Sequence, residues 1–167
     1  MAYSIYTIAG GQPIANTETS QKQPLGTIVR GWDPTYGEGE FIYLLGVAST
    51  VVGSVVKYNT TTYQTALLSV ANGKNKGLPV AVAMSANVAS QYGWYQIGGN
   101  AVIKKTTVAV SPGVPIFISA TDGRIKVLAS AGQQILGAQT ANLATVVTTT
   151  STVVVNINRP HTQGQIT

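Results

Sequence analysis

The residues of this chain that could perform acid–base or nucleophilic chemistry are few and scattered. His161 is the one histidine, and it follows Pro160 in a polar segment, 161–167, that we predict to be a tail. A nucleophile triad needs a base that a further side chain orients. The sequence offers His161 no such partner, so we interpret it as a solvated side chain.

The closest pair of acids is Glu38 and Glu40, which flank Gly39 in a glycine-rich stretch. Two carboxylates about 5 to 10 Å apart could hydrolyse a glycosidic bond. We expect these two acids to be solvated residues of a loop, and with Asp33 and Asp122 they lack the spacing of a calcium loop. The chain contains no cysteine, which excludes disulfides and thiolate chemistry. We therefore expect no enzyme, no cofactor and no metal site.

The aromatic run at Tyr92, Trp94 and Tyr95 is the remaining candidate for a binding site. It could stack on sugars, stack on bases, or lie in the core or at a subunit interface. Trp and Tyr are the side chains that most often anchor protein interfaces. We predict a core or interface role, and we place Trp94 and Tyr95 among the partner-contacting residues together with Trp32 and Tyr36.

Charge is scarce in this chain of 167 residues. Asp, Glu, Lys and Arg make up 9% of it, against about 25% in an average protein. The net charge of +5 reflects few acids, because the seven lysines are spread along the chain and form no dense stripe of the kind that binds nucleic acid. The composition predicts a surface largely covered by other protein, with no nucleic-acid partner. No apolar run approaches the length of a membrane span, and the N-terminus does not resemble a signal peptide.

Short β-branched runs separated by Gly, Pro, Asn and Asp predict an all-β fold, a compact barrel or sandwich that could be β-tulip-like, with at most one short helix. The best helical candidate is 85–92, and 31–40 reads as a loop. We expect strands at 25–30, 41–48, 51–58, 63–70, 79–84, 94–97, 101–104, 116–119, 124–128, 135–138 and 152–158. Asp122 and Gly123 predict a tight hairpin, because these residues tolerate positive φ. The segment 145–155, rich in Thr and Val, reads as strand or interface.

Residues 1–24 stand apart from the single β domain that we predict over 25–160. Pro13 and Pro24 enclose a polar run, a composition typical of an extended arm. The tip of this arm could add as a strand to the sheet of a partner. The residues that we predict to make this contact are Tyr3, Ile5, Tyr6 and Ile8; the alternative is a frayed terminus.

Several segments resemble the small head-decoration, or cement, proteins of tailed phages. They are 36–43, 45–48, 53–56, 80–86 and 92–97, then Gly99, Ala101 and the closing Asn158, Arg159 and Pro160. The resemblance implies a homotrimer on the outer surface of the virion capsid, clamping subunits of the major capsid protein after synthesis in the host cytoplasm. It implies no catalytic residue and no membrane partner.

Two other classes of function stay open at this point. A receptor-binding or carbohydrate-binding phage module would need an exposed aromatic platform with acids or amides beside it. A binder of single-stranded nucleic acid would need its lysines to converge on one groove.

Overall fold

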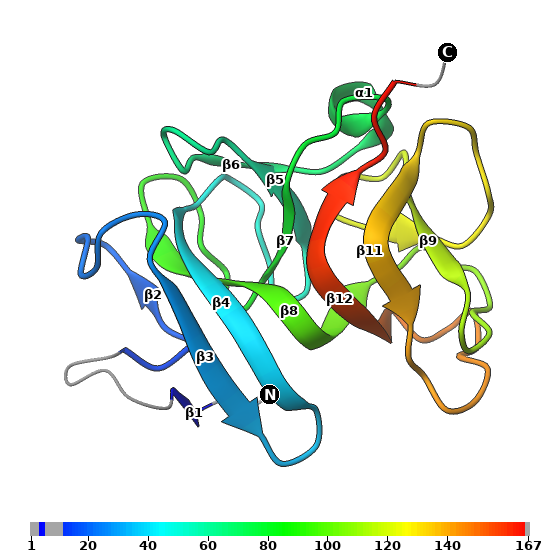
Figure 1. Ribbon diagram of the computed structural model, residues 1–167, viewed down its shortest axis with the longest axis horizontal. Coiled ribbons are helices and arrows are strands. Elements are labelled where there is room, and N and C mark those ends of the chain that lie inside the picture. The colour runs from blue at the N-terminus through cyan, green and yellow to red at the C-terminus, as the bar shows by residue number, and fades with distance from the viewer. Residues whose placement is uncertain (1–3, 6–11, 166–167) are drawn as a thin grey trace.

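The computed structural model describes residues 4–5 and 12–165, and the fold is all-β with one short helix, as the sequence predicts. Its strands pair antiparallel in the order β1-β3-β4-β8-β12-β11-β9-β10, with β2 and β7 also on β8, β5 on β7, and β6 on β5 (Figure 1). The elements are β1 Ser4–Ile5, β2 Thr17–Glu18, β3 Ile28–Asp33, β4 Gly37–Leu45, β5 Val55–Tyr58, β6 Thr65–Leu67, α1 Val70–Gly73, β7 Val80–Ala83, β8 Tyr92–Lys104, β9 Pro115–Ile118, β10 Ile125–Lys126, β11 Gln134–Thr140 and β12 Thr152–Thr162.

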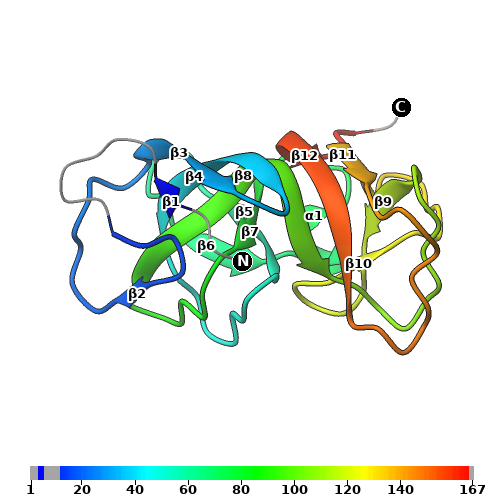
Figure 2. The same ribbon diagram turned by 90° about the horizontal axis from the view of Figure 1, so that it is seen from below.

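Strand β8 is the long central element that joins two halves of the molecule. The sequence predicted two strands, 94–97 and 101–104, whereas the structure has one strand that changes its partner at Gly98 and Gly99. Before this pair β8 lies against β4, and after it β8 lies against β12. Gly99 has a φ of +89°, and a Cβ there would collide with the backbone carbonyl of Glu38, so the crossing depends on glycine. The sheet bends here into two lobes, which lie side by side in Figure 2.

The aromatic lobe consists of β1 to β7 and residues 92–97 of β8. Strand β4 is buried on both faces: Phe41 and Tyr43 pack with Trp94 on one face, and Ile42 and Leu44 pack on the other. A parallel bridge between Leu45 and Gln64 brings the β6 side of the sheet back to β4. The strands β4, β8, β7, β5 and β6 therefore enclose the second of these clusters, as in a small barrel.

The aliphatic lobe consists of residues 100–104 of β8 and strands β9 to β12. Its core is formed by valines and isoleucines, among them Ile103, Ile116, Ile135 and Val155. The pleat of β7 connects this core to the other lobe, because Val80 and Val82 point into the aliphatic core while Ala81 and Ala83 point into the barrel. Strand β7 therefore contributes side chains to both cores.

Two local predictions were wrong and one was confirmed. The helix lies at α1 and not at 85–92, because the Asn72 side chain accepts a hydrogen bond from the Ser69 amide at 3.0 Å and starts the turn. The predicted loop 31–40 is a hairpin of β3 and β4, whose tight turn forms where the Asp33 carboxylate accepts the amides of Thr35 and Tyr36 at 2.8 and 3.0 Å. The hairpin at Asp122 and Gly123 joins β9 to β10, with Gly123 at a φ of +69°.

The described parts of both predicted terminal segments are packed more closely on the β domain than the sequence suggests. Ile14 is buried in the aromatic core, and β2 pairs with β8, so the described part of 12–24 packs on the domain instead of extending from it. The predicted tail 161–167 begins two residues too early, since His161 and Thr162 belong to β12. Thr162 is held there because it exchanges backbone and side-chain hydrogen bonds with Leu78, at 2.9 and 2.8 Å.

Candidate subunit-contact surface

Two neighbouring loops at one end of the aliphatic lobe form a candidate contact surface. They are 106–114, between β8 and β9, and 141–151, the orange segment at the lower right of Figure 1. Val110 and Val146 exchange backbone hydrogen bonds at 2.9 Å in both directions, so the loops lie side by side. We call residues 106–114 and 141–151 the uncharged loop pair, because neither loop contains Asp, Glu, Lys, Arg or His.

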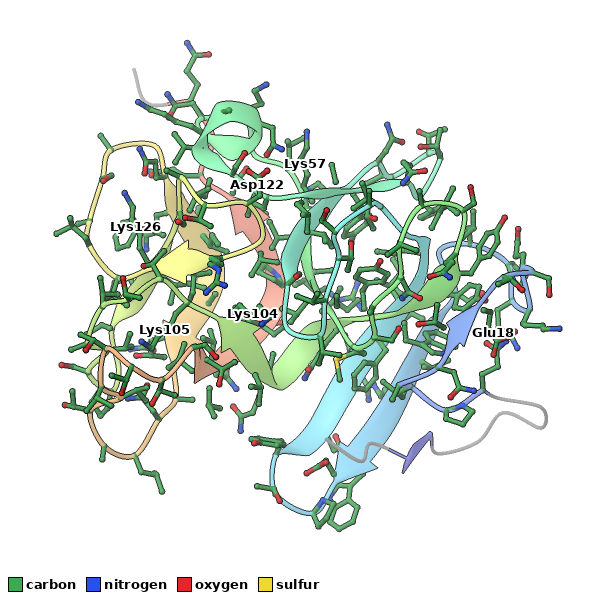
Figure 3. All side chains as sticks on the ribbon, turned by 180° about the vertical axis from the view of Figure 1, so that it is seen from behind. Glu18, Lys57, Lys104, Lys105, Asp122 and Lys126 are labelled. Atoms are coloured by element: carbon green, nitrogen blue, oxygen red, sulfur yellow. The ribbon has the colours of Figure 1, made fainter. Side chains whose placement is uncertain are left out.

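Lys105 connects the two loops of the uncharged loop pair through hydrogen bonds. Its side chain is buried, and its Nζ donates hydrogen bonds to the carbonyl oxygens of Val108 at 2.7 Å and Val147 at 3.1 Å, one in each loop. Figure 3 shows Lys105 in the aliphatic lobe, next to the loops. Desolvation lowers the pKa of this ammonium group below its usual value of 10.5. A buried cation that is bonded to two loops restricts their movement relative to each other.

Further inward-directed hydrogen bonds satisfy the backbone of the loops. The Asn142 amide donates to the carbonyl oxygens of Val110 at 3.1 Å and Ala144 at 2.7 Å, and the Thr140 hydroxyl donates to that of Ser111 at 2.9 Å. These three carbonyl oxygens therefore already have partners within the chain. A partner that covers the loops would not leave them unpaired.

The outer side of the loop pair carries apolar side chains and uncharged polar side chains. Leu143 is fully exposed and the Val147 side chain is 57% exposed, while the rest of 141–151 is mostly Thr, Ala and Ser. Exposed apolar side chains that form a contiguous patch are a feature of protein-binding surfaces. The sequence signal was present, because residues 127–158 contain no charged side chain, but only 145–155 was interpreted as strand or interface.

Trp94 and Tyr95, for which the sequence left a core or an interface role open, lie in the core of this chain. Their side chains are 1% and 0% exposed. The two residues point to opposite faces of β8, and each face is covered: Trp94 packs on Tyr43, with ring centroids 5.0 Å apart, and Tyr95 lies inside the barrel. Burial raises the pKa of the Tyr95 hydroxyl to about 12.

The other predicted contact residues lie on the aromatic lobe, away from the loop pair. Trp32 is 46% exposed on the outer face of β3, and Tyr36 is partly buried against the aromatic core. Ile5 lies in β1, whose backbone pairs with β3 of the same chain. Tyr3, Tyr6 and Ile8 lie outside the described residues, so the predicted strand addition to a partner stays a prediction.

The candidate chemical groups are dispersed in the structure. Both carboxylate oxygens of Glu40 are engaged in ion pairs, with Arg30 at 3.0 Å and with Arg159 at 3.3 Å, and His161 is an exposed residue of β12. Within 4–5 and 12–165, the structure groups no three His, Asp or Glu side chains at a spacing that could hold a metal ion. The same part of the chain has no helix with the length and apolar character to cross a bilayer.

A comparison with models of known protein families finds no match, and a comparison with curated protein sequences finds none either.

Proposed function

We propose that this chain is a structural virion protein that binds the outside of an assembled phage head as a homotrimer and stabilises the lattice of the major capsid protein. The observation that carries the proposal is the uncharged loop pair, with its exposed Leu143 and Val147 on a backbone fixed by Lys105. The resemblance of segments 36–43 and 92–97 to head-decoration proteins supports the same function.

The scarcity of charge favours a surface that is covered in the working state of the protein. Fifteen charged side chains serve 167 residues, and none of them falls within 127–158. A surface that stays in water usually keeps more charge, because charge limits non-specific association. A surface covered by protein gains from having little, since buried charges must be desolvated.

The mechanism of stabilisation is thermodynamic linkage. A protein that binds the assembled shell, and not its free subunits, stabilises the shell by mass action. The uncharged loop pair would supply apolar contact area in this interaction. Because few ion pairs would then be available for screening, we expect affinity for heads to fall only slightly between about 0.05 and 0.5 M salt.

A head-binding experiment tests the proposal. Undecorated heads are incubated with the wild type, with the double variant Leu143→Ser and Val147→Ser, or with the control Lys74→Ser, which lies after α1 on an exposed turn. Co-sedimentation should show saturable binding by the wild type and the control, and at least tenfold weaker binding by the double variant. Undiminished binding by the double variant would exclude the loop pair, and no binding by the wild type would exclude a decoration function on those heads.

The oligomeric state is tested separately. Light scattering of the purified protein at micromolar concentration should give about three times the chain mass. A stable monomer would contradict the homotrimer and leave the capsid contact to be judged by co-sedimentation.

A further inference from the structure

A shallow groove lies on the sheet where β8 changes its partner, and it is lined by residues of β3, β4, β8 and β12. Gly98 pairs with Glu40 on one side and with Asn158 on the other, and Gly99 pairs with Gly39 and Ile157. Three neighbouring glycines thus meet at the bend, and they line a hollow together with the polar residues around them. The hollow has a volume of about 580 Å³.

The walls of this groove carry hydrogen-bonding groups of balanced charge. Arg30, Glu38 and Glu40 line one side, and Asn156, Asn158 and Arg159 line the other. The Glu40 carboxylate accepts from Arg30 Nε at 3.2 Å and Nη2 at 3.0 Å, and from Arg159 Nη2 at 3.3 Å. Since each guanidinium group has five N–H donors, this bridge orients both arginines and leaves donors to spare. Exposed ion pairs add little stability, so orientation is their main effect here.

A half-exposed tryptophan stands beside the polar groove. Residues alternate between the two faces of β3, so Trp32 shares the outer face with Arg30. Trp32 is also the cross-strand partner of Glu38, which places both side chains on one face. An indole ring that is 46% exposed offers a flat apolar surface next to carboxylate and guanidinium groups.

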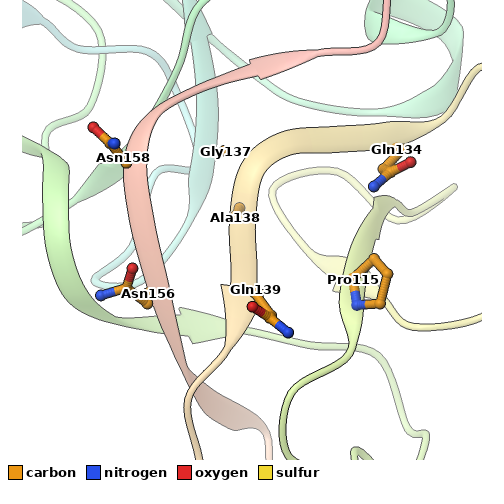
Figure 4. A pocket seen from close by; sticks show the side chains of 7 residues that line it. All are labelled: Pro115, Gln134, Gly137, Ala138, Gln139, Asn156 and Asn158. Carbon is orange, nitrogen blue, oxygen red and sulfur yellow. The ribbon is translucent and has the colours of Figure 1, made fainter.

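The polar track continues over β12 into a second hollow of about 370 Å³ (Figure 4). Asn156 and Asn158 line both hollows, and Gln134 and Gln139 of β11 line the far side of the second one. A register shift after Leu136, with Gly137 at a φ of +70°, opens the space between the two glutamines. The track runs across β3, β4, β8, β12 and β11, which at the usual strand spacing is about 19 Å.

We infer that this track is a binding site for a neutral oligosaccharide. Sugar hydroxyl groups both donate and accept hydrogen bonds, and side-chain amides provide a donor and an acceptor in one plane. The apolar face of a pyranose ring can stack on the indole of Trp32 while its hydroxyl groups reach Glu38 and Arg30. An exposed aromatic ring with an acid beside it is what a carbohydrate-binding module requires, and the amides of β12 and β11 extend the site along the track.

The charges of the groove argue against other ligands. Two arginines and two glutamates give no net charge, so a polyphosphate or a polyuronate would meet as much repulsion as attraction. The residues of this site and those of the uncharged loop pair do not overlap, so the inference does not depend on the capsid-binding proposal.

A carbohydrate microarray with neutral and acidic oligosaccharides of two to eight units is the first test. We expect binding to one or more neutral glycans, with preference for chains of four or more units, and titration calorimetry then gives the dissociation constant. Trp32→Ala should raise that constant at least tenfold, and the double variant Asn156→Ala, Asn158→Ala at least fivefold. The control Leu128→Ala, an exposed apolar residue outside the groove, should leave it unchanged.

The thermal midpoint of each variant shows whether it is folded, and the asparagine variant decides the matter if Trp32→Ala does not fold. The inference is overturned if no neutral glycan binds, if only acidic glycans bind, or if the folded variants bind as tightly as the wild type.

Discussion

The cores of the two lobes differ in residue composition. Eleven of the twelve aromatic residues of the chain occur at or before Tyr95, and Phe117 is the one that follows. The aromatic lobe packs a few large rings, with Tyr43, Tyr92 and Trp94 in contact, whereas the aliphatic lobe packs many valine and isoleucine side chains. Charge divides the molecule in a similar way, since the long uncharged segment 127–158 belongs to the aliphatic lobe.

This difference shows how stability and contact are separated in one small sheet. Large rings concentrate stabilisation in a few positions, because each buries 150 to 250 Å². Numerous small branched side chains distribute the stabilisation over many positions. The exterior of the same lobe is largely uncharged. The comparison predicts that single substitutions should act very differently in the two lobes.

The largest difference is expected between core truncations. Trp94→Ala should lower the free energy of unfolding by about 4 kcal/mol, because it removes the ring on which Tyr43 packs. Val155→Ala in the aliphatic core should cost about 2 kcal/mol, since it removes two methyl groups. Urea unfolding followed by circular dichroism measures both values. Equal losses would mean that the rings do not concentrate stability as we infer.

The next largest effect is expected at Lys105, the buried lysine of the aliphatic lobe. Lys105→Ala removes a donor to the carbonyl oxygens of Val108 and Val147, and we expect a loss of about 3 kcal/mol together with faster amide exchange in both loops. The control Lys104→Ala changes the adjacent, partly exposed lysine and should cost under about 0.5 kcal/mol. Exchange rates that stay the same in Lys105→Ala would show that this side chain does not hold the loops.

Alkaline titration should act on the two lobes with opposite signs. The pKa of Tyr95 is about 12 in the folded protein and 10.0 in an unfolded reference, so between these values the folded state binds more protons and stability falls as pH rises, by up to about 1.4 kcal/mol per pH unit. The pKa of Lys105 is lowered, so between that lowered value and 10.5 the unfolded state binds more protons at this group and stability rises with pH.

Melting curves between pH 8 and pH 11.5 measure these slopes. Tyr95→Phe should flatten the decline above pH 10, whereas a decline of unchanged steepness would assign it to other groups, such as Tyr58, whose pKa burial also raises.

The smallest expected change in stability is at the uncharged loop pair. The double variant Leu143→Ser and Val147→Ser should unfold within about 0.5 kcal/mol of the wild type, because both side chains are exposed. Combined with the loss of head binding that we propose, this would separate contact from folding. A large loss of stability would show that these residues serve the core and not a partner.

Much of the fold was accessible from the sequence because alternation and turn residues are local signals. The hairpin at Asp122 and Gly123 is an example. Gly123 has a positive φ, and glycine is the residue type that adopts positive φ most readily. The continuity of β8 was not accessible, because Gly98 and Gly99 read locally as a break. Only tertiary pairing with β4 and β12 keeps this segment extended.

The candidate surfaces were harder to predict than the fold. Aromatic residues are enriched both in cores and at interfaces, so the types of Trp94 and Tyr95 could not distinguish the two, and burial on both faces of β8 decided for the core. The groove combines residues of β3, β4, β8 and β12, and some of them, such as Arg30 and Arg159, are more than a hundred positions apart. No window of sequence contains that juxtaposition.

The position of β12 has a consequence for how the protein is made. This strand comes last in the described chain, yet it lies inside the sheet, between β8 and β11. During synthesis, β9, β10 and β11 are therefore produced before the strand that connects them to β8 exists. At about 5 to 20 residues per second, a few seconds separate the translation of β11 from that of β12. Through that interval the nascent aliphatic segment has open strand edges and few charges, so it is exposed to pairing with other chains until β12 closes the sheet.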